Sequence, residues 1–193
     1  LSVKIWSRSQ WFSALKSVKA LVRQVLRNNN IEKGSVGLIG HSFGGYAAAF
    51  IATQTDMFRT VVAGAPVTDL ISWYHDIQGN GWDTEQMWRL ENHQFRMGGS
   101  FYDHRNRYYR NSPMHHVEKL EVPLLIWEGK EDYNINWYQS IYMFMAMKRL
   151  NKDSKLLLFN DDGHNMIKPD NQKKLSEEVF HWFSFYLKEE RSE

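Results

Sequence analysis

The stretch Gly40-His41-Ser42-Phe43-Gly44 has the pattern G-x-S-x-G, and its neighbours on both sides fit one structural setting. A short apolar run at residues 36–39 precedes it, and Tyr46-Ala47-Ala48-Ala49 follows it. We predict a strand, a tight turn and a helix, the arrangement that lifts a nucleophilic serine clear of a sheet. The flanking glycines are expected to avoid Cβ clashes where strand and helix approach closely. The alternative is a plain glycine-rich turn, and the fit of both flanks favours Ser42 as a nucleophile.

The rest of the chain alternates apolar segments with amphipathic ones. We predict strands at residues 35–40, 60–67, 122–128 and 155–159, and helices at residues 11–26, 43–53, 70–74, 84–97, 103–109, 137–150 and 171–187. A turn is predicted at Ser112-Pro113. The inward face of the last helix is predicted to consist of Leu175, Val179, Trp182, Phe183 and Tyr186. Such alternation predicts an α/β fold with a mainly parallel sheet and flanking helices. In these folds the loops after the strands build the site, so the partners of Ser42 are expected to follow later strands.

The length and composition of the chain limit the kinds of function that it can have. A length of 193 residues indicates one domain. The net charge of +2, with acids and bases interspersed, points to neither a nucleic acid nor a membrane surface as partner. The chain has no Cys, which excludes disulfides and thiol chemistry. A metal site built from Asp103, His104, His115 and His116 has the wrong spacing, so we expect neither a metal nor an organic cofactor. The sequence does not indicate a compartment.

A serine nucleophile needs a base, and His164 is the best candidate among eight histidines. It lies in the loop Asp161-Asp162-Gly163-His164, directly after the last predicted strand. The order Ser, acid, His is the one that this kind of fold uses. His41 is adjacent to the nucleophile, but its side chain is expected to leave the turn in a different direction. The alternative for His164 is an ordinary surface-loop histidine.

The base needs a carboxylate to orient it, and Asp132 is favoured for that role. It follows the third predicted strand in the loop Gly129-Lys130-Glu131-Asp132. Four other acids compete with it: Glu128, Glu131, Asp161 and Asp162. Glu128 still belongs to the strand, and Glu131 could be a solvent-exposed acid adjacent to Asp132. Asp161 and Asp162 are expected to shape the loop that carries His164.

Four stretches together resemble the prolyl oligopeptidase family of serine peptidases. They are residues 40–48, residues 65–69 (Ala-Pro-Val-Thr-Asp), residues 112–132 with Ser-Pro, Val-Pro-Leu-Leu-Ile and Gly-Lys-Glu-Asp, and Gly163-His164 with the closing helix. The resemblance runs along nearly the whole chain from about Trp11. It implies an α/β-hydrolase fold, Ser42 as nucleophile, Asp132 as orienting acid, His164 as base and short peptides as substrates.

The same resemblance implies further site residues. The backbone N–H of Phe43 is expected to bind the oxyanion. A substrate pocket is expected from Val67, Leu70, Trp73, Asn134 and Ile135, for which ordinary core packing is the alternative. Leu70 and Trp73 differ from the aromatic pair of dipeptidyl peptidase IV-like members, so the resemblance does not imply that this chain prefers proline in its substrates.

Part of the family pattern is not found before Ser42. A second oxyanion donor, from an early glycine-rich loop or a tyrosine, has no counterpart there. We therefore expect residues 1–193 to form a single, partial catalytic domain with the last four of eight strands, the upstream strands and a β-propeller being absent from this chain. The strand at residues 35–40 then becomes an open apolar edge. Its expected partner is the missing N-terminal part of the protein or a second chain, and a homo-oligomer stays open.

The function predicted from these residues is that of a serine peptidase, which hydrolyses oligopeptides through an acyl-enzyme. Two alternatives remain. The same triad serves a carboxylesterase of small esters. Without half of the oxyanion hole, the chain is also compatible with a catalytically incomplete binding or assembly fragment.

Overall fold

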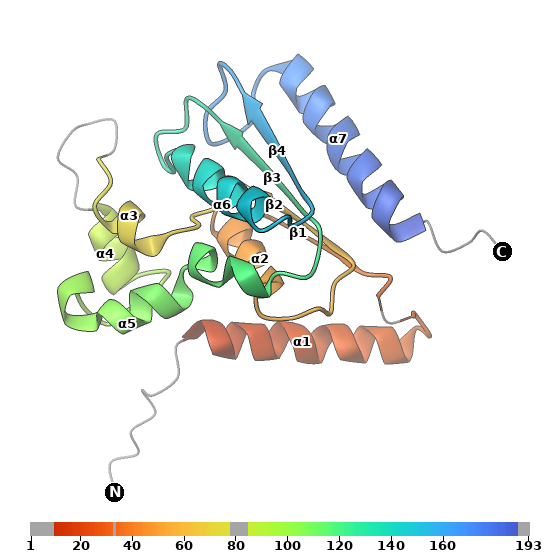
Figure 1. The fold of residues 1–193 in the computed structure, drawn as a ribbon, viewed down its shortest axis with the longest axis horizontal. Coiled ribbons are helices and arrows are strands. Elements are labelled where there is room, and N and C mark those ends of the chain that lie inside the picture. The colour runs from red at the N-terminus through yellow and green to blue at the C-terminus, as the bar shows by residue number, and fades with distance from the viewer. Residues whose placement is uncertain (1–9, 33, 78–84, 189–193) are drawn as a thin grey trace, which may run out of the picture.

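The computed structural model describes residues 10–32, 34–77 and 85–188, with side chains from residue 15 onward (Figure 1). Its elements in chain order are α1 (Gln10–Asn28), β1 (Gly37–His41), α2 (Phe43–Ala52), β2 (Thr60–Gly64), α3 (Leu70–Tyr74), α4 (Glu85–Glu91), α5 (Phe101–Asn111), the 3₁₀ helix η1 (Pro113–Lys119), β3 (Leu124–Gly129), α6 (Tyr138–Arg149), β4 (Ser154–Phe159) and α7 (Pro169–Lys188).

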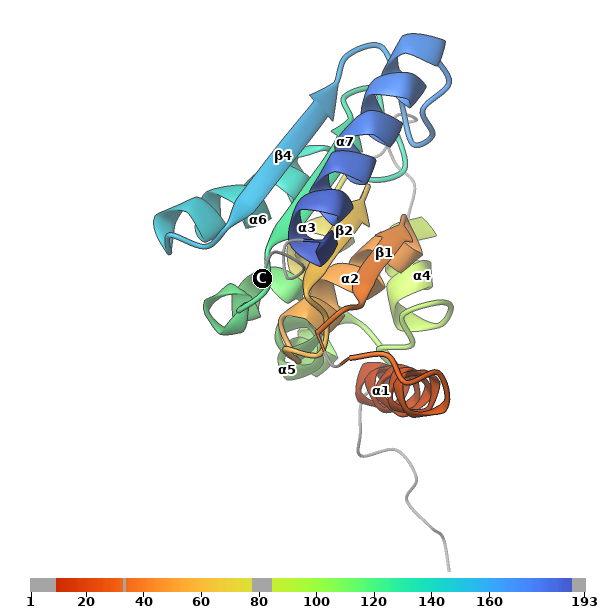
Figure 2. The same cartoon turned by 90° about the vertical axis from the view of Figure 1, so that its right-hand side faces the viewer.

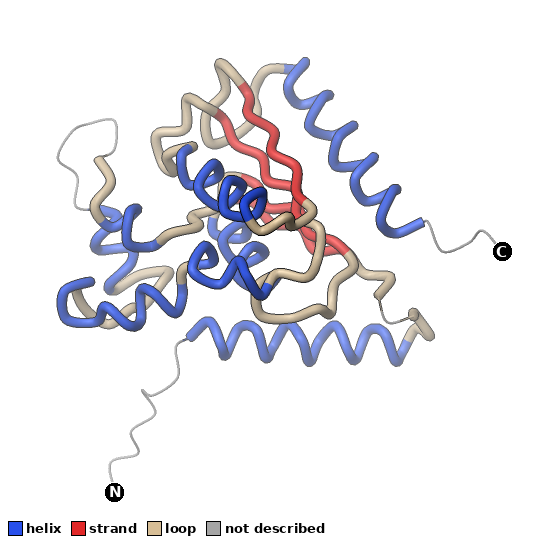
Figure 3. The backbone as a smooth tube through the Cα atoms, viewed as in Figure 1, coloured by secondary structure: helices blue, strands red, loops and turns tan. Residues whose placement is uncertain are grey.

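The four strands form one sheet in the order β1-β2-β3-β4, and every neighbouring pair is parallel. This confirms the predicted parallel sheet. Figure 3 shows the strands in red between the blue helices. Because all strands run the same way, their carboxyl ends meet along one rim, where the loops after β1, β3 and β4 lie close together. β1 lies at the edge of this sheet, and Ile39 in its middle is 58% exposed.

Helices cover both faces of the sheet. Figures 1 and 2 show α2 and α6 on one face and α7 on the other. Alternate side chains of β2 show this division, since Val61 and Ala63 pack in the cluster with α2 and α6, whereas Val62 packs in the cluster with α7. The predicted inward face of α7 is confirmed: Trp182 is buried in that cluster, and Leu175, Val179, Phe183 and Tyr186 pack against it.

Several predicted boundaries were wrong. The strand predicted at residues 60–67 ends at Gly64, because Ala65 has a φ of 43° and turns the chain out of the sheet. The helix predicted at residues 84–97 ends at Glu91, and residue 84 lies outside the described residues. The helix predicted at residues 103–109 begins at Phe101, because Ser100 caps it by accepting a hydrogen bond from Asp103 N. The Ser112-Pro113 turn opens η1, whose first turn tolerates proline.

The segment between β2 and β3 forms a third layer beside the sheet (Figure 1). Its helices α3, α4 and α5 surround an aromatic cluster that includes Trp73, Phe95 and Tyr108. Tyr46 and Phe50 of α2 belong to the same cluster, so this layer is anchored to the helix that follows Ser42. Among the described residues, no helix combines the length and the apolar character needed to cross a bilayer.

Candidate active site

Ser42 lies in a strained turn between β1 and α2. Its φ of 59° and ψ of −122° place a non-glycine residue in a rarely populated region of backbone space. The turn is held by a 2.8 Å hydrogen bond from Ser42 N to Gly64 O of the neighbouring strand. A Cβ on Gly40 would overlap the carbonyl oxygen of Gly44, as expected for a flanking glycine, but a Cβ on Gly44 would meet nothing within 4 Å.

Three predicted residues come together at the carboxyl rim of the sheet. The Nε2 atom of His164 lies 2.7 Å from Ser42 Oγ, and its Nδ1 atom lies 2.6 Å from Asp132 Oδ2. His164 is on the loop after β4, and Asp132 is on the loop after β3. The imidazole therefore bridges a hydroxyl and a carboxylate that are far apart in the chain.

Asp132 is held as a carboxylate by donors on both of its oxygens. Oδ1 accepts hydrogen bonds from Asn134 N at 2.7 Å and Ile135 N at 3.0 Å, while Oδ2 faces His164. Burial raises the pKa of Asp132, but the hydrogen bonds from His164, Ile135 and Asn134 outweigh it and hold the pKa below its ordinary value. The carboxylate is thus fixed in orientation and charged near neutral pH.

The competing acids lie in different settings. Asp162 is buried and accepts hydrogen bonds from Ile167 N and Lys168 N, so it shapes the His164 loop as expected. Asp161 forms an exposed ion pair with Lys168 at 3.1 Å, and Glu131 is exposed. No hydrogen bond between any of these acids and the imidazole of His164 occurs among the described residues.

A cavity of about 210 Å³ opens beside Ser42 and His164. Its other lining residues are Phe43, Val67, Trp73, Arg89, Gln94, Phe95, Asn134 and Ile135. Leu70, which was expected in this pocket, does not line it. It is fully buried in the aromatic cluster, because its backbone N–H is tied to Ser112 Oγ and its side chain faces the core.

Arg89, Gln94 and Phe95 were missed by the sequence analysis. They come from α4 and the residues after it, and Arg89 also pairs with Glu85. The sequence carries no motif at these positions. The one available signal was the aromatic richness of the segment, which did not specify which side chains face Ser42.

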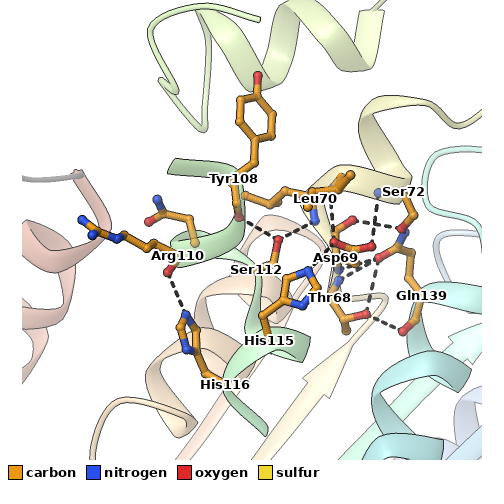
Figure 4. A network of polar contacts seen from close by, with 12 residues as sticks. Thr68, Asp69, Leu70, Ser72, Tyr108, Arg110, Ser112, His115, His116 and Gln139 are labelled. Carbon is orange, nitrogen blue, oxygen red and sulfur yellow. Dashed lines mark hydrogen bonds and ion pairs between the residues drawn. The ribbon is translucent and has the colours of Figure 1, made fainter. Parts of the chain in front are cut away.

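A buried polar network is built on the chain segment between two of the residues that line the cavity, Val67 and Trp73; Figure 4 shows this network. Gln139 Oε1 accepts hydrogen bonds from Thr68 N and Asp69 N, and the Gln139 side-chain amide donates to Ser72 Oγ. Asp69 caps α3 by accepting from Ile71 N and Ser72 N. The network joins α6 to the start of α3, and so holds Val67 and Trp73 on either side of Asp69 in place.

The two adjacent histidines of η1 take part in separate contacts. His115 Nε2 lies 3.3 Å from Asp69 Oδ1, whereas His116 Nε2 lies 3.1 Å from the carbonyl oxygen of Arg110 (Figure 4). Within residues 10–32, 34–77 and 85–188, no three His, Asp or Glu side chains are grouped so as to hold a metal ion.

Comparison with known proteins identifies the family of this chain. The sequence model of the prolyl oligopeptidase family matches residues 13–190. The chain belongs to this family. Its relatives include an uncharacterised peptidase, YuxL, of Bacillus subtilis, which is 27% identical over 88% of this chain and 25% of its own length. Dipeptidyl-peptidase 5 of Porphyromonas gingivalis is 26% identical over 86% of this chain and 24% of its own length.

Solved structures agree on the fold of this member of the prolyl oligopeptidase family. An acylaminoacyl peptidase of Pyrococcus horikoshii superposes with a TM-score of 0.80 at 20% identity, covering 93% of this chain and 28% of that one. The chain has the α/β-hydrolase fold. It spans about a quarter of the length of the curated relatives that it matches.

This family member carries a second, buried acid close to Asp132. Glu128, the penultimate residue of β3, is fully buried, and its Oε2 accepts a 3.0 Å hydrogen bond from Ser140 Oγ. Its Oε1 has no hydrogen-bond partner among the described residues. Burial, followed by the nearby carboxylate of Asp132, raises the pKa of Glu128 to about 10. Glu128 is therefore protonated and neutral when Asp132 is charged.

Glu128→Gln is expected to stabilise the fold, increasingly so at higher pH. The pKa of Glu128 is about 10 when folded and 4.5 in its ordinary state, so unfolding releases a proton, and stability falls as pH rises from about 4.5 to 10. Glutamine does not ionise, so the substitution restores the free energy of unfolding that the shifted pKa of Glu128 removes, about 3 kcal/mol at pH 7. Thermal unfolding of both proteins between pH 5 and 9 measures it. The exposed Glu131→Gln is the matched control, and a difference from wild type that does not widen with pH contradicts the prediction.

Proposed function

We propose that this chain carries the catalytic residues of a serine peptidase that hydrolyses peptide bonds of oligopeptides through an acyl-enzyme. The observation that carries the proposal is the continuous path of hydrogen bonds from Ser42 through His164 to Asp132. Membership of the prolyl oligopeptidase family supports the choice of peptides over other acyl compounds. The cavity beside Ser42, walled by Val67 and Trp73, supports binding of a side chain next to the scissile bond.

In the first half of the reaction, Ser42 Oγ attacks the carbonyl carbon of the substrate and His164 Nε2 takes the hydroxyl proton. The backbone N–H of Phe43, directly after the nucleophile at the start of α2, donates to the oxyanion. Asp132 keeps the proton on His164 Nδ1 and stabilises the imidazolium. The C–N bond then breaks, His164 gives its proton to the leaving amine, and the acyl group stays on Ser42.

In the second half, a water molecule attacks the acyl carbon while His164 takes one of its protons. The proton returns to Ser42 Oγ as the C–O bond to the serine breaks, releasing a carboxylic acid. The same groups act in both halves. Val67, Trp73, Asn134 and Ile135 bind the acyl side, together with Arg89, Gln94 and Phe95.

A further part of the proposal is that residues 1–193 act as one portion of a larger catalytic domain. The chain spans about a quarter of its relatives' length, and β1 is an edge strand of the described sheet, with the side chain of Ile39 exposed on one face of it. An unpaired strand edge is a template for pairing with another strand. An upstream segment of the same protein, or a second chain, pairs there and supplies the second oxyanion donor.

Labelling with a fluorophosphonate tests the function. The complete protein encoded by the gene that contains this sequence (the full gene product) is expected to form one adduct, on the peptide with Ser42, by mass spectrometry. Acyl-peptide anilides are expected to be turned over faster than p-nitrophenyl esters of small acids. Heat-denatured protein is the control and should not react. The absence of an adduct on Ser42 would contradict the proposal, and faster ester turnover would favour the carboxylesterase alternative.

A further inference from the structure

A row of residues crosses the carboxyl end of the sheet and ends beside His164. His41 in β1 is in register with Gly64 in β2, and Gly64 is in register with Trp127 in β3. Because side chains alternate between the two faces of a sheet, residues in register on parallel neighbours share a face. His41 and Trp127 therefore point to the same side, with no side chain between them.

Gly64 leaves the space through which Trp127 reaches His41. A Cβ on Gly64 would overlap the indole of Trp127, so that ring lies over β2. The indole stacks on the imidazole of His41 with ring centroids 5.0 Å apart and an interplanar angle of 8°. Stacking of this kind adds to the energy of burial and fixes the plane of the smaller ring.

The fixed imidazole of His41 is bonded to the backbone of the histidine in the triad. His41 Nε2 donates a 2.8 Å hydrogen bond to the carbonyl oxygen of His164, and the two rings are 4.9 Å apart. A carbonyl only accepts, so Nε2 of His41 carries a hydrogen. Burial lowers the pKa of His41, with a smaller contribution from His164, although the bond to the His164 carbonyl and the charge of Asp132 oppose this. His41 is thus a neutral donor and adds no second positive charge beside an imidazolium on His164.

We propose that His41, held flat by Trp127, is a positioning residue that anchors His164 in line between Ser42 and Asp132. The inference rests on the proposed function. The imidazole of His164 contacts Asp132 at 2.6 Å and Ser42 at 2.7 Å, and both distances depend on the position of the His164 backbone. The hydrogen bond from His41 Nε2 to the carbonyl oxygen of His164 fixes that backbone. A displacement of about 1 Å in a reacting group costs on the order of 10²-fold in rate.

The test compares three variants of the full gene product with wild type, using kcat, KM and the rate of fluorophosphonate labelling. His41→Leu, which removes the donor, is expected to lower kcat and the labelling rate about 10–100-fold while KM changes little. His41→Gln keeps a side-chain N–H donor and is expected to recover most of the loss. Trp127→Leu removes the stacking on His41 but leaves the hydrogen bond from His41 to the His164 carbonyl. This variant is also expected to lower kcat.

The matched control is His116→Leu, because His116 also bonds a backbone carbonyl, that of Arg110, but lies outside the site. It is expected to match wild type. A folded His41→Leu variant that labels within threefold of wild type overturns the inference, as does equal loss in the Leu and Gln variants. If His41→Leu does not fold, an unchanged kcat in Trp127→Leu overturns it. An unlabelled wild type instead contradicts the proposed function itself.

Discussion

Replacement of Ser42 by alanine is expected to lower kcat by on the order of 10⁶-fold in the full gene product. In the proposed mechanism the hydroxyl supplies the atom that attacks the substrate, and its proton leaves through the 2.7 Å contact with His164 Nε2. Alanine keeps the backbone of the turn and the cavity but removes both. KM is expected to change little, since the lining of the cavity is otherwise preserved. Steady-state kinetics with an acyl-peptide anilide measure the loss.

The control for this variant is Ser176→Ala, which removes an exposed hydroxyl that donates to Gln172 O in α7. Its kcat should equal that of wild type. A Ser42→Ala protein that keeps more than about one per cent of wild-type kcat, with contamination excluded by active-site titration, would mean that another group is the nucleophile.

Replacement of Asp132 by asparagine is expected to lower kcat about 10⁴-fold. Asn fits the space and its oxygen can still accept from Asn134 N and Ile135 N, but its NH₂ group would then face His164 Nδ1. An NH₂ group donates, so it favours the tautomer with hydrogen on Nε2, which cannot take the proton of Ser42. The loss should fall on kcat and on the labelling rate together.

Asp161→Asn is the matched control for this change. Asp161 is also an aspartate in a loop after a strand, and its positive φ of 60° is one that asparagine tolerates. Its kcat is expected to stay within about twofold of wild type. Equal losses in the two variants would show that Asp132 acts through loop structure or surface charge and not through the tautomer of His164.

Much of the fold was predictable because its signals are local. Each of the four strands is a short apolar run between turn residues, and the Ser42 turn has its glycine at Gly40 for a steric reason that the sequence reveals. The proximity of Ser42, Asp132 and His164 follows from chain order combined with parallel strands, which bring all strand ends to one rim.

What could not be predicted depends on tertiary packing. Arg89 and Phe95 reach the cavity because α4 packs against α3 and the ring of Phe95 packs against Phe43 and Tyr46 of α2, and nothing in their local sequence encodes these contacts. The family resemblance predicts Leu70 in the pocket, but its backbone N–H donates to Ser112 Oγ and its side chain is buried in the aromatic cluster. His41 can stack on Trp127 only because Gly64, in the strand between them, has no side chain. The spacing of these residues in the sequence does not reveal this contact.

Apart from Ser42 and His164, five of the eight residues that line the cavity come from one excursion of the chain between β2 and β3, whereas Ser42, Asp132 and His164 lie on turns and loops that directly follow strands of the sheet. Natural variation can therefore reshape the excursion, by substitution or by insertion, and leave the reacting groups where they are. Under the proposed function, substrate selectivity is expected to diverge first in this segment, and the same segment is where residues would be randomised to change selectivity.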